Sequence, residues 1–208
     1  IIIVGIIYLL YIYVLNIIKM FISRTPFRLP IAGGGTDLPS YYKIKGGLFI
    51  SSSINKYIYV SINRRWKLGY LFKYSKIENV KSILNIKHPI IKASLSNFKS
   101  KDQLEIVSIS DIPAGTGLGS SGSFTVGLLN SLHAYNHQTT SQSELAEKAC
   151  NIEMNILKEP SGKQDPYAAS FGGIKIFEIN NMGVVKVKEL NLDPDFRKEF
   201  EESLTLFF

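Results

Sequence analysis

Alternating apolar and polar positions mark most of the strands that we expect in this chain. Residues 104–110, LEIVSIS, alternate with period two, as the residues of a half-buried strand do. Residues 48–54 and 57–62 are rich in β-branched side chains, and we expect them to form the two strands of a hairpin. The segments GGIKIFEI and GVVKVKEL, residues 172–179 and 183–190, predict a second hairpin.

Apolar residues that recur every three or four positions predict two helices in the second half of the chain. The first follows Ser123 directly, so that the glycine-rich segment 113–122 runs from a strand into a helix N-terminus. The second begins at Ser141, because the sequence SQSE can form a capping box with Glu144, and it stops before Pro160. The expected order around the glycines is therefore strand, loop, helix.

Proline positions shape the expectation for three further segments. Pro89 favours the start of a helix, so we expect one over residues 88–98. Residues 21–32 are expected to be extended, and Pro30 marks them as an edge strand or a bulge because it cannot donate to a sheet ladder. Residues 161–167, SGKQDPY, are expected to form a loop.

The N-terminal segment IIIVGIIYLLYIYVLNII is nearly all apolar, and its length makes it a marginal candidate for a membrane span. No basic region precedes it and no small-residue cleavage site follows it, which argues against a signal peptide. The first methionine is Met20. We interpret residues 1–19 as a hydrophobic leader that is an artefact of the reading frame or, if translated, a membrane anchor or a buried element.

The C-terminal residues suggest the start of a second domain. In residues 191–208 a short helical pattern gives way to an apolar, strand-like run over residues 204–208. Such a run is hard to stabilise alone, so we expect a truncated C-terminal domain here and one complete domain over residues 20–190.

Composition narrows the class of protein. Of the 208 residues, 45% are hydrophobic and 20% are charged, which is typical of a globular chain rather than a disordered one. The formal net charge is +7, but the lysines are scattered rather than gathered in one run. We therefore expect a small anionic substrate and no nucleic acid partner.

The cysteine and histidine positions offer little to a metal site. Cys150 is the single cysteine, so no internal disulfide can form, and this fits a reducing cytoplasm. We expect Cys150 to be a packing residue. His133 and His137 have the spacing of zinc ligands, but Ala134 stands where a HExxH motif has its catalytic glutamate, so we expect surface or packing roles for both.

The sequence PAGTGLGSSGS, residues 113–123, carries the strongest chemical signal. Its four glycines let backbone amides approach an anion, and the following helix adds its positive N-terminal end. Ser120 and Ser121 add hydroxyls that can bond phosphate oxygens or hold Mg²⁺. A plain turn between a strand and a helix would need fewer glycines.

Two other phosphate loops are weighed against this segment. Gly117, Gly119 and Gly122 satisfy the GxGxxG pattern of dinucleotide-binding folds. Such folds need an acidic residue at the end of the next strand, whereas Glu144 belongs to a helix cap. A Walker A loop would end in Gly-Lys-Ser/Thr, and that ending is absent.

PAGTGLGSSGS is similar to the central motif of the galactokinase, homoserine kinase, mevalonate kinase and phosphomevalonate kinase (GHMP) superfamily. The segment TPFRLPIAGGGTDLP resembles that superfamily's first motif, and the resemblance extends over about residues 20–208. RTPFRLPIAGGGTDLPSYY and IEMNILKEPSGKQDPYAASFGG look most like the sugar kinases that phosphorylate D-glycero-D-manno-heptose 7-phosphate at the anomeric hydroxyl. The superfamily's third, C-terminal glycine-rich motif does not occur in the sequence.

The resemblance implies an α+β fold, namely a GHMP kinase N-terminal domain. This domain has a ribosomal-protein-domain-2-like mixed sheet with helices on one side, and the ferredoxin-like C-terminal domain would be mostly missing. It also implies ATP-dependent phosphorylation of a sugar or sugar phosphate, with another GHMP kinase of the galactokinase or fucokinase kind, or an inactive nucleotide-binding fragment, as alternatives. The residues implied in ATP binding are Pro113, Gly115, Gly117, Leu118, Gly119, Ser120, Ser121 and Gly122.

Further roles are carried over from the superfamily to matching positions. Asp165 matches the catalytic aspartate that orients or deprotonates the attacking hydroxyl, and Arg28 matches an arginine near the transferred phosphate. Glu153 matches the Mg²⁺-binding glutamate, with Ser121 as the second metal ligand, and its place beside the apolar stripe of its helix lets it point inward. We expect Lys163 to be a solvated loop lysine.

The sugar is expected to lie on the first motif, and here the chain departs from the galactokinase pattern. Asp37 matches a residue that hydrogen-bonds sugar hydroxyls, and Thr36 and the glycines let a sugar lie close to the backbone. Gly34 and Gly35 stand where galactokinase-like motifs carry Glu-His, so the substrate cannot be copied from galactokinase.

Overall fold

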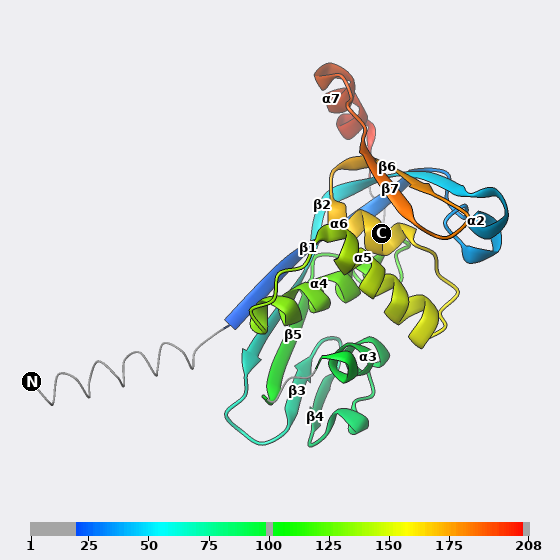
Figure 1. The fold of residues 1–208 in the computed structure, drawn as a ribbon. Coiled ribbons are helices and arrows are strands. Elements are labelled where there is room, and N and C mark those ends of the chain that lie inside the picture. Colours follow the sequence, from blue (N-terminus) through cyan, green and yellow to red (C-terminus); the bar gives the residue numbers. More distant parts are fainter. Residues whose placement is uncertain (1–19, 99–101, 206–208) are drawn as a thin grey trace, which may run out of the picture.

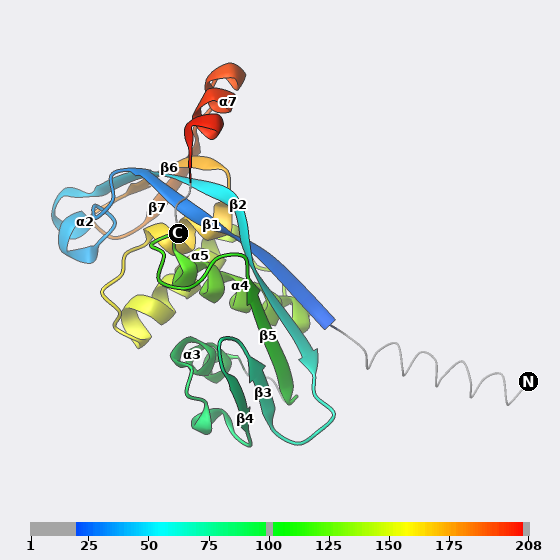
Figure 2. The ribbon, with the colours of Figure 1, turned by 180° about the vertical axis from the view of Figure 1, so that it is seen from behind.

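The computed structural model of the chain describes residues 20–98 and 102–205. The expected leader, residues 1–19, and residues 206–208 of the apolar C-terminal run lie outside these ranges. The described part is a mixed sheet with helices α4, α5 and α6 packed on one face (Figure 1). From behind, strands β1, β2 and β5 lie in front of these helices (Figure 2). This confirms the expected α+β architecture with helices on one side of the sheet.

The sheet has seven strands, and its long central strand is β2. On one edge β2 pairs with β1, and on the other it pairs with β5 near its C-terminal end and with β6 near its N-terminal end. All pairings are antiparallel except that of β3 with β5. The strands are β1 (Met20–Ala32), β2 (Gly47–Arg64), β3 (Tyr70–Lys73), β4 (Ile77–Val80), β5 (Leu104–Ser110), β6 (Ile174–Ile179) and β7 (Val185–Glu189).

The region expected to be a hairpin over residues 48–62 is one continuous strand, so that prediction is wrong. The β1 register passes from Pro26 opposite Tyr57 to Arg28 opposite Ser53. Several β2 residues therefore face a single β1 residue, and the polar interruption in the sequence is a bulge rather than a turn. A second register shift falls at Pro30, as expected for a proline in an edge strand.

The helices expected from the apolar periodicity are present, and the Ser141–Glu144 capping box forms with both of its hydrogen bonds. The helix expected after Pro89 is present as well. None of the helices within the described ranges combines the length and the apolar character that crossing a bilayer requires. The helices are α2 (Pro39–Lys45), α3 (Pro89–Asn97), α4 (Ser120–Tyr135), α5 (Gln142–Cys150), α6 (Gln164–Phe171) and α7 (Pro194–Ser203), with a 3₁₀ turn at Ile83–Asn85 and a π-helical turn, η2, at Asn151–Ile156.

Helix α6 lies where a loop was expected, which is the second wrong prediction. Pro166 occupies its first turn, where a proline costs no intrahelical hydrogen bond, and Gly172 ends it with a φ of +64°. Tyr167, Ala168 and Ala169 are buried. Packing against the neighbouring helices, rather than a long amphipathic stripe, stabilises this helix.

Two apolar clusters form the core. The larger lies between the sheet and helices α3 and α4 and includes Phe27 and Leu128. The smaller lies between α5, α6 and β6, where the rings of Phe49 and Phe177 stack with centroids 4.7 Å apart. Cys150 is buried in this second cluster, which confirms its packing role, and burial raises the pKa of its thiol.

Glu78 on β4 ties this strand to the start of α3. Its buried carboxylate accepts hydrogen bonds from the Tyr74 hydroxyl at 2.6 Å and from the backbone N–H groups of Lys87 at 2.7 Å and His88 at 3.0 Å. Burial alone would raise the pKa of Glu78, but these hydrogen bonds and the His88 charge lower it below its usual value. Burial and the Glu78 carboxylate raise the pKa of Tyr74 to about 12.

Replacing Glu78 with glutamine should lower the free energy of unfolding by about 2 kcal/mol at pH 7, because an amide places a donor against backbone donors. A lowered pKa in the folded state means that the carboxylate stabilises above the unfolded value of about 4.5 and that this is lost as pH falls through the folded value. Urea denaturation at pH 7 and pH 3.5 measures the free energy of unfolding of Glu78→Gln and of wild type. The two free energies should differ less at pH 3.5 than at pH 7. Glu202→Gln, an exposed control on α7, should change little, and an equal loss at both pH values for Glu78→Gln would contradict the charge-based account.

Candidate functional site

The glycine-rich loop joins β5 to α4, and two of its glycines allow close contact with other elements. Gly119, at the N-cap of α4, has a φ of +76°, and an added Cβ there would lie 3.0 Å from Cγ of Arg28. An added Cβ at Gly122 would lie 2.6 Å from Cβ of Asp165. These positions therefore need glycine because β1 and α6 pass directly against the start of α4.

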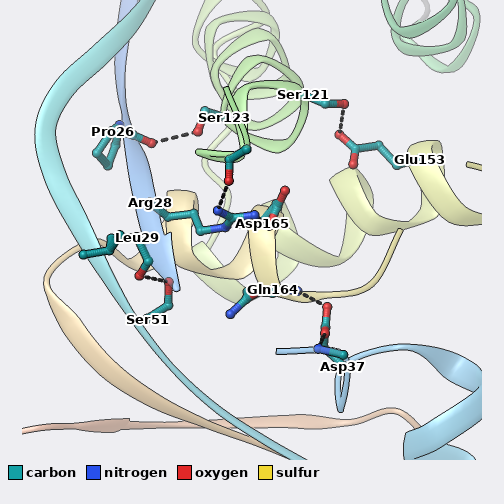
Figure 3. A network of polar contacts seen from close by, with 12 residues as sticks. Pro26, Arg28, Leu29, Asp37, Ser51, Ser121, Ser123, Glu153, Gln164 and Asp165 are labelled. Atoms are coloured by element: carbon teal, nitrogen blue, oxygen red, sulfur yellow. Dashed lines mark hydrogen bonds and ion pairs between the residues drawn. The ribbon is translucent and has the colours of Figure 1, made fainter. Parts of the chain in front are cut away.

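The N-terminus of α4 is open to an anion. Gly119 provides no side-chain cap, so the positive end of a 16-residue helix faces the loop. Residues 113–117 are exposed, whereas Leu118 is buried in the core. The Ser123 hydroxyl donates a hydrogen bond to the Pro26 carbonyl at 2.8 Å and so links α4 to β1 (Figure 3). This hydroxyl is therefore already used inside the protein.

Arg28 and Asp165, 137 positions apart in sequence, form an ion pair beside this loop (Figure 3). Arg28 Nε and Nη2 lie 2.7 and 2.6 Å from Oδ1 of Asp165. Nη1 donates to the Gly117 carbonyl at 2.6 Å, and the backbone N–H of Arg28 donates to the Leu118 carbonyl at 3.1 Å. Arg28 is 9% exposed, so its guanidinium is held between the loop and the first turn of α6.

Ser121 and Glu153 form a pair of oxygen donors on the other side of the α4 N-terminus. The exposed Ser121 hydroxyl donates to Oε1 of Glu153 at 3.0 Å (Figure 3). The buried Thr125 hydroxyl donates to the same oxygen at 2.7 Å. Glu153 lies on η2 and is 3% exposed, which agrees with the expectation that it points inward. Burial raises the pKa of its carboxyl, the two hydroxyl donors oppose the rise, and the charges of Asp165 and Glu159 add to it.

Thr125 is a site residue that the sequence motifs did not indicate. It lies four positions after Ser121 and is fully buried. Because residues four apart share a face of a helix, this spacing is the signal that could have identified it.

The segment over residues 33–37 is held by hydrogen bonds to its own backbone and to its neighbours. The Thr36 hydroxyl lies 2.8 Å from both the Gly33 and the Leu48 carbonyl oxygens. Gly34 and Gly35 are exposed. Asp37 is only 6% exposed, and its carboxylate accepts backbone hydrogen bonds rather than facing open solvent.

Lys163 differs from the expectation of a solvated loop lysine. It is buried, and its Nζ lies 2.5 Å from Oε1 of Glu147 on α5 and 2.7 Å from the Gly183 carbonyl. The same Glu147 oxygen accepts a hydrogen bond from the Tyr167 hydroxyl at 2.5 Å. Lys163 therefore fastens α6 to α5, and the expectation is wrong because the loop that contains it is packed under the β6–β7 turn.

The structure thus brings most of the sequence-predicted residues to the α4 N-terminus. Arg28 and Asp165 lie on one side of this helix end, and Ser121 and Glu153 lie on the other. The 33–37 segment is connected to the site through the hydrogen bond between Asp37 and Gln164. Across residues 20–98 and 102–205, no group of three or more His, Cys, Asp or Glu side chains is placed to hold a metal ion. A hollow of about 1010 Å³ lies elsewhere, along α5 and η2.

Comparison with known proteins shows which sequences the chain resembles. Residues 85–173 match the family described as the GHMP kinases N terminal domain. The chain is 29% identical over 198 residues to D-glycero-alpha-D-manno-heptose 7-phosphate kinase of Campylobacter jejuni, with 89% of the chain covered. It is 24% identical over 190 residues to L-fucokinase/L-fucose-1-P guanylyltransferase of Bacteroides fragilis, covering 75% of the chain and 20% of that protein.

The fold comparison points the same way. The crystal structure of a D-glycero-D-manno-heptose 1-phosphate kinase from Bacteroides thetaiotaomicron superimposes with a TM-score of 0.81 at 29% identity, covering 89% of the chain. The chain spans 64% of that structure and 58% of the Campylobacter relative. Residues 85–173 thus match the GHMP kinases N terminal domain, and the fold of the described residues is similar to that of a heptose phosphate kinase.

Proposed function

We propose that the chain contributes the ATP-binding and sugar-binding parts of an ATP-dependent sugar kinase. The single observation that carries the proposal is the Arg28–Asp165 ion pair, which places a carboxylate and a guanidinium beside the open N-terminus of α4. Phosphoryl transfer needs a group that orients the acceptor hydroxyl, cationic groups near the transferred phosphate, and close placement of both substrates. We assign these tasks to residues within the 20–190 unit.

In this proposal the phosphates of ATP lie on the loop of residues 113–122. The backbone N–H groups at the start of α4 point toward the phosphate oxygens, and the helix end favours negative charge. The Gly119 and Gly122 backbones bring α4 close to Arg28 and Asp165. A phosphate at the helix end is therefore also next to the ion pair.

Asp165 orients the acceptor hydroxyl and takes up its proton as the new bond to phosphorus forms. Its side chain keeps 30% of its surface exposed, so an acceptor can reach the carboxylate, whereas Arg28 is nearly enclosed. Arg28 has two tasks, since it holds one oxygen of Asp165 and presents positive charge near the developing negative charge. Its third nitrogen is fixed on the Gly117 carbonyl.

The residues present fit a magnesium ion, held by Ser121 and Glu153. The two side chains offer a hydroxyl and a carboxylate oxygen 3.0 Å apart, and Mg²⁺ binds through one or two protein oxygens together with phosphates and water. When bound, the ion neutralises charge on the β and γ phosphates. The hydrogen bond from the Thr125 hydroxyl holds the Glu153 carboxylate in one orientation, so the orientation of the carboxylate is set before a ligand binds.

For the substrate we propose a sugar phosphate of the heptose class, most closely D-glycero-D-manno-heptose 7-phosphate with transfer to the anomeric hydroxyl. The support is the similarity to the heptose phosphate kinases over 89% of the chain. The fucokinase relative makes a fucose-like sugar the second candidate. Gly34 and Gly35 leave the 33–37 segment without bulky side chains, which suits a large acceptor. The scattered positive charge and the single buried cysteine support a cytoplasmic enzyme acting on an anionic sugar.

Asp165→Asn should lower kcat by about 100-fold or more, because an amide cannot take up the proton, while the affinity for ATP stays within about threefold of wild type. Steady-state ADP release and calorimetric ATP binding measure the two effects. Asp195→Asn, an exposed aspartate on α7, is the matched control. Unchanged turnover in Asp165→Asn would remove this residue from the mechanism.

Ser121→Ala and Glu153→Gln should each raise the Mg²⁺ concentration needed for half-maximal activity by about tenfold or more. The same variants should weaken the Mg²⁺-dependent part of ATP binding measured by calorimetry, which does not depend on turnover. Glu199→Gln, an exposed glutamate on α7, should match wild type. Equal Mg²⁺ dependence in all three variants would contradict the assigned ligands.

A panel of sugars, sugar phosphates and mevalonate, assayed for ADP release by the full chain, tests the substrate class. We expect the highest kcat/KM with a heptose 7-phosphate and less than about one hundredth of it with galactose. A preference for fucose would favour the second candidate. Reaction with mevalonate alone would show that the substrate class is wrong.

A further inference from the structure

Both oxygens of the Asp37 carboxylate are used inside the protein. Oδ1 accepts a hydrogen bond from the backbone N–H of Gly35 at 3.1 Å, and Oδ2 accepts one from the backbone N–H of Gln164 at 3.0 Å. The Asp37 carbonyl accepts a third from the backbone N–H of Lys163 at 3.4 Å. One side chain therefore joins the 33–37 segment to the start of α6 (Figure 3).

Helix α6 has no cap of its own, and Asp37 supplies one from a distant part of the chain. Lys163 occupies the N-cap position, and its side chain makes no capping hydrogen bond to the helix. The backbone N–H of Gln164, the first residue of α6, is one of the amides that a helix leaves unpaired. A carboxylate suits this end of the helix because its charge complements the helix dipole.

The contact is tight, and the polar anchoring of Gln164 depends on it. An added Cβ at Gly162 would lie only 2.0 Å from Oδ2 of Asp37, so the chain before α6 runs directly against the carboxylate. Nε2 of Gln164 is buried without a hydrogen-bond partner among the residues the structure describes. The side-chain nitrogen of Gln164 adds no such anchor, and the bond from its backbone N–H to Asp37 holds the first residue of the helix.

Asp165 is the next residue along α6, so the position of Gln164 sets the position of its carboxylate. On the opposite side Asp165 is confined by Gly122, where an added Cβ would lie 2.6 Å from its Cβ. Arg28 holds the end of the side chain. The backbone position of Asp165 is therefore fixed on one side by packing against α4. On the other side it is fixed by the hydrogen bond between Asp37, in the 33–37 segment, and Gln164.

We propose that Asp37 is a positioning residue whose carboxylate couples the 33–37 segment to the first turn of α6 and so places Asp165 for catalysis. This inference rests on the proposed function for the role of Asp165, although the coupling itself is a property of the fold. A role as a sugar ligand alone would leave the start of α6 without its cap. A sugar that seats on the 33–37 segment acts on Asp165 through this carboxylate, so the segment and the catalytic helix respond together.

The first test measures the coupling without turnover. In Asp37→Asn the amide nitrogen replaces one acceptor, so exchange of the Gln164 backbone N–H, followed by NMR on the full chain without sugar, should become about tenfold faster or more. Asp193→Asn is the matched control, because Asp193 caps α7 through hydrogen bonds to Asp195 and Phe196. It should leave Gln164 exchange unchanged. Unaltered exchange in Asp37→Asn would overturn the proposal, whether or not the chain proves to be a kinase.

The second test separates positioning from sugar contact by kinetics. Asp37→Asn should lower kcat about tenfold with KM for the sugar within about threefold, and in an Asp165→Asn background the same change should lower kcat less than twofold, because Asp37 acts through Asp165. A rise in the sugar KM with kcat unchanged would show a direct ligand and overturn the proposal.

A second variant covers the case in which Asp37→Asn does not fold. Asp37→Glu keeps the charge, but its extra methylene does not fit beside Gly162, so it too should speed Gln164 exchange and lower kcat. Wild-type exchange in a folded Asp37→Glu chain would contradict the coupling. If none of the substrates in the panel leads to ADP release, the kinase proposal is refuted. The exchange measurement still decides the role of Asp37 in that case.

Discussion

The arrangement of this site depends on the close approach of two helix N-termini, those of α4 and α6. Gly122 on α4 has no side chain, and only for this reason can the backbone of α6 pass at the position of Asp165 and Pro166. Two positive helix ends at this distance repel each other. The Asp165 carboxylate lies between them and its charge is in turn balanced by Arg28. The close packing of the α4 and α6 backbones therefore requires the charge balance that Asp165 and Arg28 provide.

The same constraint explains why the polar residues of the site are so deeply enclosed. Arg28 lies on a strand that leaves the core at this point, and its backbone N–H and guanidinium are both bound to the glycine loop. Glu153 is buried, and within the described residues the hydroxyls of Ser121 and Thr125 donate hydrogen bonds that compensate in part for its lost hydration. Burying a charge in this way is costly, and a divalent cation at the Ser121 side would offset that cost. In the proposed function, a phosphate and a metal ion would balance these buried charges.

Local patterns were sufficient for the elements whose stability is local. The capping box at Ser141, the alternation in β5 and the periodicity of α4 each depend on neighbouring residues, and each was predicted correctly. Helix α6 was missed because its stability comes from Tyr167 packing in a core that residues far away in sequence complete. The bulge in β2 was taken for a turn for a related reason, since only the pairing with β1 shows that the strand continues.

The residues of the candidate site likewise fall into those that local sequence patterns indicate and those that only the folded structure brings together. Residues carried by a motif, such as Ser121 and Asp165, could be proposed from the sequence because a motif is tied to the chemistry of a ligand. Thr125 was missed although its spacing from Ser121 could have indicated it. The Lys163–Glu147 pair could not be predicted, because these two side chains meet only after folding. Asp37 lies between these cases: its motif indicates a sugar ligand, whereas its 6% exposure and two backbone donors indicate a helix cap. Because both carboxylate oxygens are bound to backbone N–H groups, our proposal makes Asp37 act through Asp165, so that catalysis depends on a buried charge that does not itself bind the sugar.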